Sequence, residues 1–178
     1  MSNNQPKVKI LISYHKPSVL LQDDVLTPIH VGRALATESS KDGNMSEEDY
    51  QWMLDNMIGD DTGDNISHLN REFCELTAMY WAWKNYDKLG NPEYIGFMHY
   101  RRLFDFIGNS KYLNINKDLN IPELKYMEKE DYFNYYNKKN LIQLIEDNKY
   151  IISEPHNSNP YEHYKSAKNL HIEDYNKC

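Results

Sequence analysis

The sequence lacks the features that mark secreted, membrane-spanning and nucleic-acid-binding proteins. Only two cysteines occur among 178 residues and they form no CxxC pair, which predicts reduced thiols in a cytoplasmic chain. The apolar run near the N-terminus is too short for a signal peptide or a membrane span. Acidic residues outnumber basic ones 27 to 20, and no cluster of five basic residues occurs, so nucleic acid is not an expected partner. A peripheral contact with the inner face of the cell membrane stays open.

Several catalytic motifs are also missing. The sequence has no GxxxxGK motif, no GxGxxG motif after an expected strand and no GxSxG motif, which removes the main support for P-loop, dinucleotide-binding and α/β-hydrolase proteins. His156, His163 and His171 do not have the spacing of a zinc finger or of an HExxH site. An EF-hand calcium loop around the stretch "DDTGD" would begin at Ile58 and end at Leu69, and neither residue binds calcium.

The hydrophobic pattern predicts one α/β domain that covers the whole chain. Apolar runs and helical periods predict the following elements: strands at 8–14, 93–100 and 150–153, and helices at 46–59, 71–86 and 138–149. Residues 26–37, with Pro28 near their start, are expected to form a short helix or a turn. Residues 109–137 are expected to be an insertion. The order of these elements favours a mainly parallel sheet flanked by helices.

The segment "DDTGDNIS" places three aspartates and an asparagine directly before an expected helix. Such side chains cap helix N-termini, so turn and cap roles are one interpretation of each residue. The group contains more carboxylates than a cap requires, which favours a role in binding sugar hydroxyls, a base, or a divalent ion that bridges to phosphates. The residues predicted to act are Asp60, Asp61, Thr62, Gly63 and Asn65 in ligand binding, Asp64 in catalysis, and Asp61 and Asp64 as metal ligands.

Polar side chains also follow two of the expected strands. "SYHKP" continues the first strand and "HYRR" ends the second. Ligands of α/β sheets bind at the carboxyl ends of strands, and a guanidinium makes bidentate contacts with phosphate. A surface ion pair for a lone arginine and a satisfied turn for a lone histidine are the ordinary interpretations. Together these segments predict nucleotide and pyrophosphate contacts: His15, Lys16 and Tyr100 as ligand-binding residues, and His99, Arg101 and Arg102 as catalytic residues.

Four segments, in this order and at these intervals, resemble a family of bacterial glycosyltransferases of capsular and exopolysaccharide biosynthesis that was long catalogued as a domain of unknown function. The segments are "ISYHKP", "DDTGDNIS", "CELTAMYWAWKN" and "YIGFMHYRRLF". The resemblance covers about residues 9–104 and continues more weakly to the C-terminal "HIEDY". It implies a GT-A-like (Rossmann-like) fold that transfers a hexose, such as galactose from a UDP-sugar donor, to a growing glycan or lipid-linked glycan.

The sequence departs from that family's pattern in two ways. GT-A enzymes carry an Asp-x-Asp metal motif at the end of a central strand, whereas this chain has "MHYRR" in the comparable place and no Asp-x-Asp anywhere. Relatives also continue beyond the position of Cys178, so parts of the acceptor-binding or catalytic site are expected to be missing.

Two models of diphosphate stabilisation follow from these residues. Either Mg²⁺ or Mn²⁺ on the acidic segment holds the diphosphate of the donor, or Arg101 and Arg102 supply the positive charge without a metal. The place of the arginines at the strand end favours the second model. Alternative interpretations are a non-catalytic protein that binds nucleotide sugars or glycans, and a structural partner in a polysaccharide assembly complex.

Overall fold

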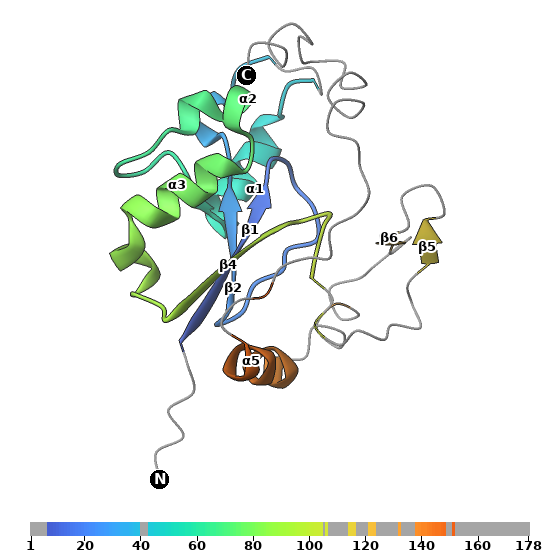
Figure 1. Ribbon diagram of the computed structural model, residues 1–178. Coiled ribbons are helices and arrows are strands. Elements are labelled where there is room, and N and C mark those ends of the chain that lie inside the picture. Colours follow the sequence, from blue (N-terminus) through green and yellow to red (C-terminus); the bar gives the residue numbers. More distant parts are fainter. Residues whose placement is uncertain are drawn as a thin grey trace, which may run out of the picture.

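The computed structural model describes residues 7–39, 43–104, 106, 114–116, 121–123, 132, 138–148 and 151. Its centre is a parallel sheet with helices on both faces (Figure 1). The strands lie in the spatial order β3-β2-β1-β4, with β1 at Val8–Tyr14, β2 at Leu26–His30, β3 at Ile58–Gly59 and β4 at Tyr94–His99. All three pairings are parallel, which confirms the predicted α/β fold with a mainly parallel sheet.

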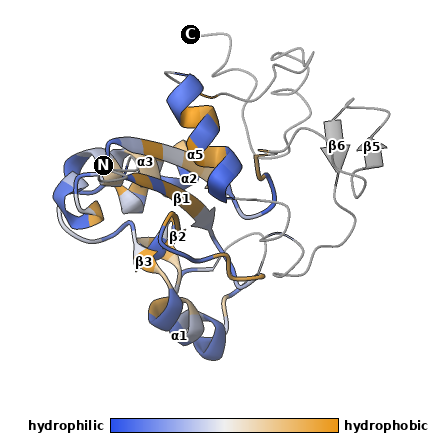
Figure 2. Cartoon of the chain, turned by 90° about the horizontal axis from the view of Figure 1, so that it is seen from below, coloured by the Kyte–Doolittle hydropathy of each residue, from blue (hydrophilic) through white to orange (hydrophobic). Residues whose placement is uncertain are grey.

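Different helices bury the two faces of the sheet. The helices are α1 (Glu47–Asn56), α2 (Asn70–Phe73), α3 (Leu76–Lys84) and α5 (Lys138–Asp147). On one face, Trp81 of α3 packs in a cluster with Leu11 of β1, and on the other Met53 of α1 and Ile145 of α5 join Ile12. The strands in Figure 2 are therefore mainly orange, while α1 shows mostly polar blue residues. A first strand buried on both faces explains why apolar residues stand next to one another, from Ile10 to Ile12, in its sequence.

Strand β2 corrects the prediction of a short helix or turn over residues 26–37. Leu26–His30 form a strand between β1 and β3, followed by a single 3-10 turn at Arg33–Leu35. Successive residues of a strand direct their backbone groups to opposite neighbouring strands. Val31 N donates to Tyr14 O of β1, whereas His30 O accepts from Asp60 N, beside β3. Pro28, two residues before His30, therefore has its nitrogen on the β3 side. β3 pairs only with Ile29 and His30. Pro28 therefore removes no hydrogen bond from the sheet.

The predicted helix over residues 71–86 is also corrected, because the chain breaks at Cys74. α2 ends at Phe73 and α3 begins at Leu76, and Cys74 has a positive φ of 47°. The side chain of Asn70 and the backbone N–H of Thr77 both donate to Cys74 O, which replaces the hydrogen bonds of a continuous helix. Periodicity could not reveal this break, since the apolar pattern runs through it.

Other elements agree with the pattern. β1 and β4 match their predicted ranges, and Ser46 caps α1 by accepting a hydrogen bond from Asp49 N. α1 nevertheless ends before Gly59, which belongs to β3. A separate antiparallel pair, β5 (Asn114–Asn116) with β6 (Ile121–Glu123), lies within the expected insertion. Of the strand expected at 150–153, only Ile151 belongs to the described residues, and it is not in a strand.

None of the helices in the described ranges has the length and apolar composition needed to cross a membrane.

Candidate functional site at the strand ends

The carboxyl ends of all four strands lie at one edge of the sheet, where α2 also lies (Figure 1). We call the residues that follow β1 and β4 there the strand-end site: His15, Lys16, His99, Tyr100, Arg101 and Arg102. Residues 60–65, which follow β3, are the acidic loop. The backbone of the acidic loop is about 14 Å, three strand spacings, from the residues that follow β4, and about 10 Å, two spacings, from those that follow β1.

Aromatic rings connect the ends of β1 and β4. The His15 ring centroid lies 5.9 Å from that of His99 and 5.4 Å from that of Tyr100, and Tyr100 stacks on Tyr14 at 5.3 Å. Tyr100 N also donates to Ser13 O, which extends the pairing of the two strands. Two segments that are more than 80 residues apart in the sequence therefore meet as the strand-end prediction requires.

The two arginines lie in a tight turn that ends β4. Arg102 N donates to His99 O at 2.8 Å, and His99 N donates to Arg102 O at 3.3 Å. Both arginines are exposed, and the Arg101 guanidinium carbon lies 5.3 Å from the Tyr100 ring centroid, a cation–π contact. Among the described residues, neither arginine forms an ion pair with a carboxylate. The turn thus presents two positive charges to a ligand at this edge. Lys16 is exposed beside it, after β1.

His99 is held in one neutral form. Its Nδ1 accepts a hydrogen bond from Arg101 N at 3.1 Å, which places the ring proton on Nε2. Burial lowers the pKa of His99 to about 4, and this effect outweighs the opposing attraction of Glu75. His99 is only 8% exposed, and its Nε2 lies 3.7 Å from Glu75 Oε1. A neutral ring with an N–H directed at a carboxylate is the result.

Glu75 is a residue of this site that the sequence reasoning missed. Its side chain is 42% exposed, so the carboxylate that faces His99 also faces solvent. The preceding Cys74 has φ 47° and ψ −128°, an unusual conformation for a residue with a side chain. That kink lies between α2 and α3 and directs Glu75 toward the end of β4. The only sequence signal is a glutamate at the start of an apolar helix, which by itself indicates nothing more than a favourable helix terminus.

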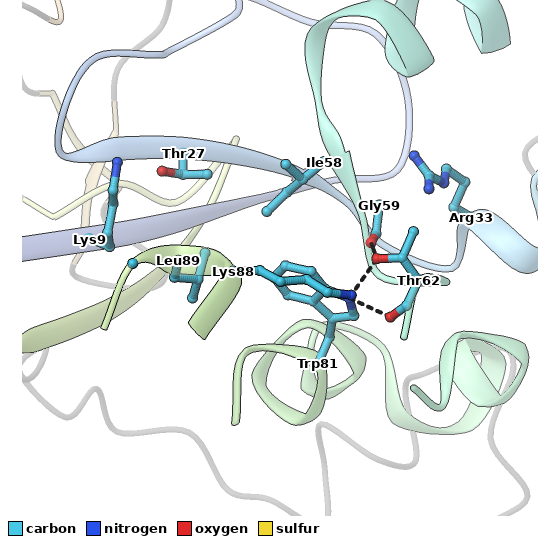
Figure 3. Close-up of a pocket in the computed structure, with 10 residues that line it drawn as sticks. Lys9, Thr27, Arg33, Ile58, Gly59, Thr62, Trp81, Lys88 and Leu89 are labelled. Carbon is cyan, nitrogen blue, oxygen red and sulfur yellow. Dashed lines mark hydrogen bonds between the residues drawn. The ribbon is translucent and has the colours of Figure 1, made fainter. Parts of the chain in front are cut away.

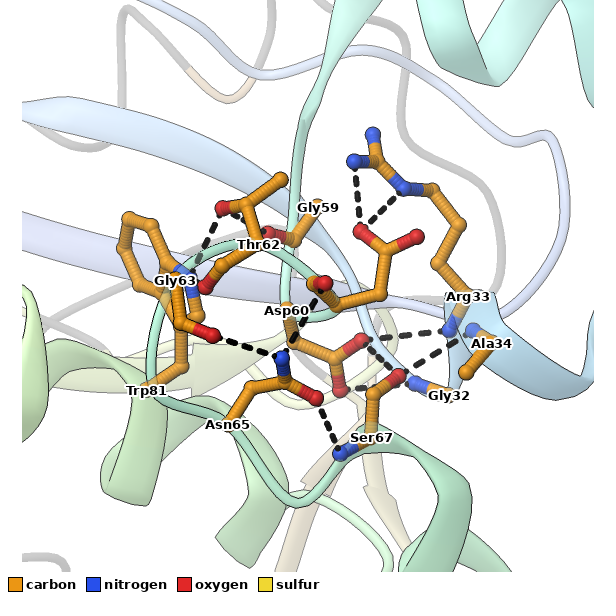
Figure 4. A network of polar contacts seen from close by, with 11 residues as sticks. Gly32, Arg33, Ala34, Gly59, Asp60, Thr62, Gly63, Asn65, Ser67 and Trp81 are labelled. Carbon is orange, nitrogen blue, oxygen red and sulfur yellow. Dashed lines mark hydrogen bonds and ion pairs between the residues drawn. The ribbon is translucent and has the colours of Figure 1, made fainter.

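Asp60 has a structural position, although it was predicted to bind a ligand. It is fully buried and accepts hydrogen bonds from Gly32 N, Arg33 N, Ser67 Oγ and Thr77 Oγ1 (Figure 4 shows the first three). These donors come from the turn after β2, from the 3-10 turn Ser67–Leu69 and from α3. The carboxylate thereby joins three elements and is not available to a ligand from solvent.

Most of the acidic loop is bonded to the protein itself. Asn65 Nδ2 donates to the carbonyls of Asp61 and Gly63, and Trp81 Nε1 donates to Thr62 O at 2.8 Å (Figure 4). Gly63 has a φ of 64°, and a Cβ there would meet Asn85 Oδ1 at 2.0 Å, so the loop requires glycine at this position. The cap and turn interpretation therefore accounts for these contacts. Ligand binding by Thr62, Gly63 and Asn65 stays a prediction.

Asp61 and Asp64 have separate partners. Arg33 Nε donates to Asp61 Oδ1 at 2.6 Å, whereas Tyr80 OH donates to Asp64 Oδ1 at 3.1 Å and Lys84 Nζ lies 3.6 Å from Asp64 Oδ2. In the part of the chain that the structure describes, no three His, Cys, Asp or Glu side chains gather as a metal site. Asp61 and Asp64 each already pair with a cation of the protein, and metal binding by these two residues stays a prediction. The mechanism below follows the arginine model.

Comparisons with known proteins agree with this architecture. The model of a family described as a domain of unknown function, DUF4422, matches residues 9–178. A solved structure of WbbM, a bifunctional glycosyltransferase in its apo form, is 31% identical over 96% of this chain, with a TM-score of 0.64. The chain spans 28% of that protein's length. No curated protein sequence matches the chain.

Proposed function

Because this chain belongs to the DUF4422 family and shares its fold with part of a bifunctional glycosyltransferase, we propose that it transfers a hexose from a UDP-sugar to a growing glycan. The resemblance described above suggests UDP-galactose as donor and a capsular, exopolysaccharide or lipopolysaccharide chain as acceptor. Such acceptors are carried on lipids at the inner face of the cell membrane, which is where we place the reaction.

The observation that carries this proposal is the composition of the strand-end site. Two exposed arginines without carboxylate partners in the described residues, a lysine and a stacked aromatic cluster lie together at the ligand-binding edge of a parallel sheet. A nucleoside diphosphate needs positive charge for its phosphates and flat surfaces for its base. The partly exposed His15 offers a ring, which packs against the buried Tyr100, and Arg101, Arg102 and Lys16 offer charge.

In the proposed step, an acceptor oxygen bonds to the anomeric carbon of the donor sugar while the bond from that carbon to the diphosphate oxygen breaks. The departing diphosphate takes the electron pair, so negative charge grows there and Arg101 and Arg102 stabilise it. The hydroxyl proton passes to a basic oxygen, on Glu75 if transfer inverts the anomeric centre or on the diphosphate if it retains it. His99 Nε2–H, held by the turn, orients the Glu75 carboxylate.

We expect UDP-sugars to raise the melting temperature and UDP to be released from them, with both effects retained in EDTA. Ligands that bind the native state stabilise it, so a thermal-shift screen of nucleotide sugars with and without Mn²⁺ identifies the donor, and a UDP-release assay measures turnover. Binding without UDP release would indicate a non-catalytic nucleotide-sugar protein. Absence of saturable binding would favour a structural role in a polysaccharide assembly complex. Complete loss of turnover in EDTA would overturn the metal-free model.

If transfer inverts the anomeric centre, Glu75→Gln should lower kcat/KM about 10²- to 10⁴-fold, the usual contribution of a general base, while UDP binding is retained. The amide keeps the size of the side chain but loses its charge and basicity. Glu72→Gln is the matched control, since Glu72 is an exposed glutamate on the neighbouring α2. Equal rates in the wild type and the Glu75 variant would remove this residue from the mechanism.

A further inference from the structure

A second pocket, of about 500 Å³, lies away from the strand-end site on the face of the sheet that α3 covers (Figure 3). Ile58 of β3 and Trp81 of α3 form apolar walls, and Thr27 and Thr62 add hydroxyl groups. Arg33 lies near the acidic loop, and Lys9 lies at the other end of the pocket (Figure 3). None of the residues of the strand-end site lines it. Its volume is that of a small-molecule site.

The charge of this pocket is opposite to that of the whole chain. Lys9, Arg33 and Lys88 line it and no carboxylate does, although the chain has a formal net charge of −7. Within the described ranges, neither lysine forms an ion pair: Lys9 Nζ donates to Asp24 O, and Lys88 Nζ lies 5.9 Å from the Trp81 ring centroid. Three cationic side chains from separate elements therefore line one pocket. Arg33 pairs with Asp61 and Lys9 lies near the Asp24 carboxylate, whereas Lys88 has no carboxylate partner among the described residues.

Gly59 makes room for the third cation. A Cβ on Gly59 would lie 1.8 Å from the guanidinium carbon of Arg33, so the guanidinium rests directly on the glycine backbone. Arg33 Nε and one terminal nitrogen both contact Asp61 Oδ1, which holds one edge of the guanidinium. A guanidinium fixed on one edge can still donate from its remaining nitrogen to an anion.

From this convergence we propose that the pocket binds a phosphorylated small molecule of sugar size, at a site separate from the strand-end site. The positive charge of Lys9, Arg33 and Lys88 attracts the phosphate, which is multiply charged. The Thr27 hydroxyl bonds to a sugar hydroxyl, and Ile58 and Trp81 contact the carbon face. An anion in the pocket competes with Asp61 for Arg33, so its binding weakens the Arg33–Asp61 ion pair of the acidic loop. This binding does not require that the chain transfer sugars.

The test uses glucose 1-phosphate as the probe, titrated calorimetrically in low salt into the full chain with saturating UDP present. The double variant Lys9→Gln/Lys88→Gln should bind it at least about tenfold more weakly, since two charge-assisted contacts are lost. Lys84→Gln/Lys138→Gln changes the net charge equally outside the pocket and should bind like the wild type. Glucose without phosphate should not bind. Melting temperatures establish that each variant is folded.

Two further variants locate the site. Gly59→Ala should also weaken binding, because its methyl group displaces Arg33 while the net charge is unchanged. Arg101→Ala, in the strand-end site, should bind the probe like the wild type. The proposal is overturned if the wild type does not bind the probe, if the pocket and control lysine variants behave alike, or if Arg101→Ala abolishes binding. These binding measurements do not depend on catalysis, so a chain that fails to release UDP from UDP-sugars would still test this proposal.

Discussion

Replacing Asp60 with alanine is expected to lower the free energy of unfolding by about 3–5 kcal/mol, the range found when a buried charge network loses one partner. Two backbone N–H groups and two hydroxyl groups donate to this carboxylate, and all four would lose their acceptor inside the protein. Since domains of this size are stable by about 5–15 kcal/mol, much of the variant would be unfolded near body temperature. Urea unfolding followed by circular dichroism measures the difference.

The matched control is Asp64→Ala, four residues along the same loop. Asp64 is 56% exposed and contacts only Tyr80 OH and Lys84 through its side chain, so its loss should cost less than about 1 kcal/mol. A small effect of Asp60→Ala, equal to that of Asp64→Ala, would contradict the structural role and return Asp60 to the candidate ligand-binding residues.

Arg101→Ala should reduce sugar transfer about 10²- to 10³-fold, the effect of removing one donor that stabilises transition-state charge. The guanidinium is exposed at the end of β4, packs on Tyr100 and forms no ion pair within the described residues, so the fold should not change. The turnover number for UDP release, measured beside the melting temperature, separates chemistry from stability.

Arg71→Ala serves as its control. Arg71 is equally a surface arginine, 59% exposed on α2, but it pairs with Glu38 and is not a residue of the strand-end site. Its removal should leave turnover within about twofold of the wild type, because exposed ion pairs contribute little. Wild-type-like turnover in the Arg101 variant would exclude the arginine model, and comparable losses in both variants would point to a general effect of charge.

The elements that the sequence predicts well are those governed by local rules. The adjacent apolar residues from Ile10 to Ile12 in β1 indicate a strand buried on both faces, and Ser46 followed by Asp49 indicates a capped helix. The convergence of His15 with His99 and Tyr100 also follows from sequence, because parallel strands bring their carboxyl ends to one edge.

The remaining features depend on tertiary contacts that no local pattern encodes. Pro28 is compatible with a strand because β3 pairs only with Ile29 and His30, so no residue of β3 lies opposite the missing N–H of Pro28. The kink at Cys74, and with it the position of Glu75, depends on hydrogen bonds from Asn70 and Thr77 to Cys74 O. Asp60, Asp61 and Asp64 look alike in the sequence, yet only the first is fully buried, since it directly follows β3.

The strand order β3-β2-β1-β4 also determines when the site can form. Val8 pairs with Tyr94, so the central strand acquires its second neighbour only after nearly a hundred residues have been made. Contacts between residues so distant in sequence carry a large entropic cost and slow folding. Until β4 leaves the ribosome, the backbone N–H and C=O groups along one edge of β1 are unpaired, and this interval is when a nascent chain most needs chaperones.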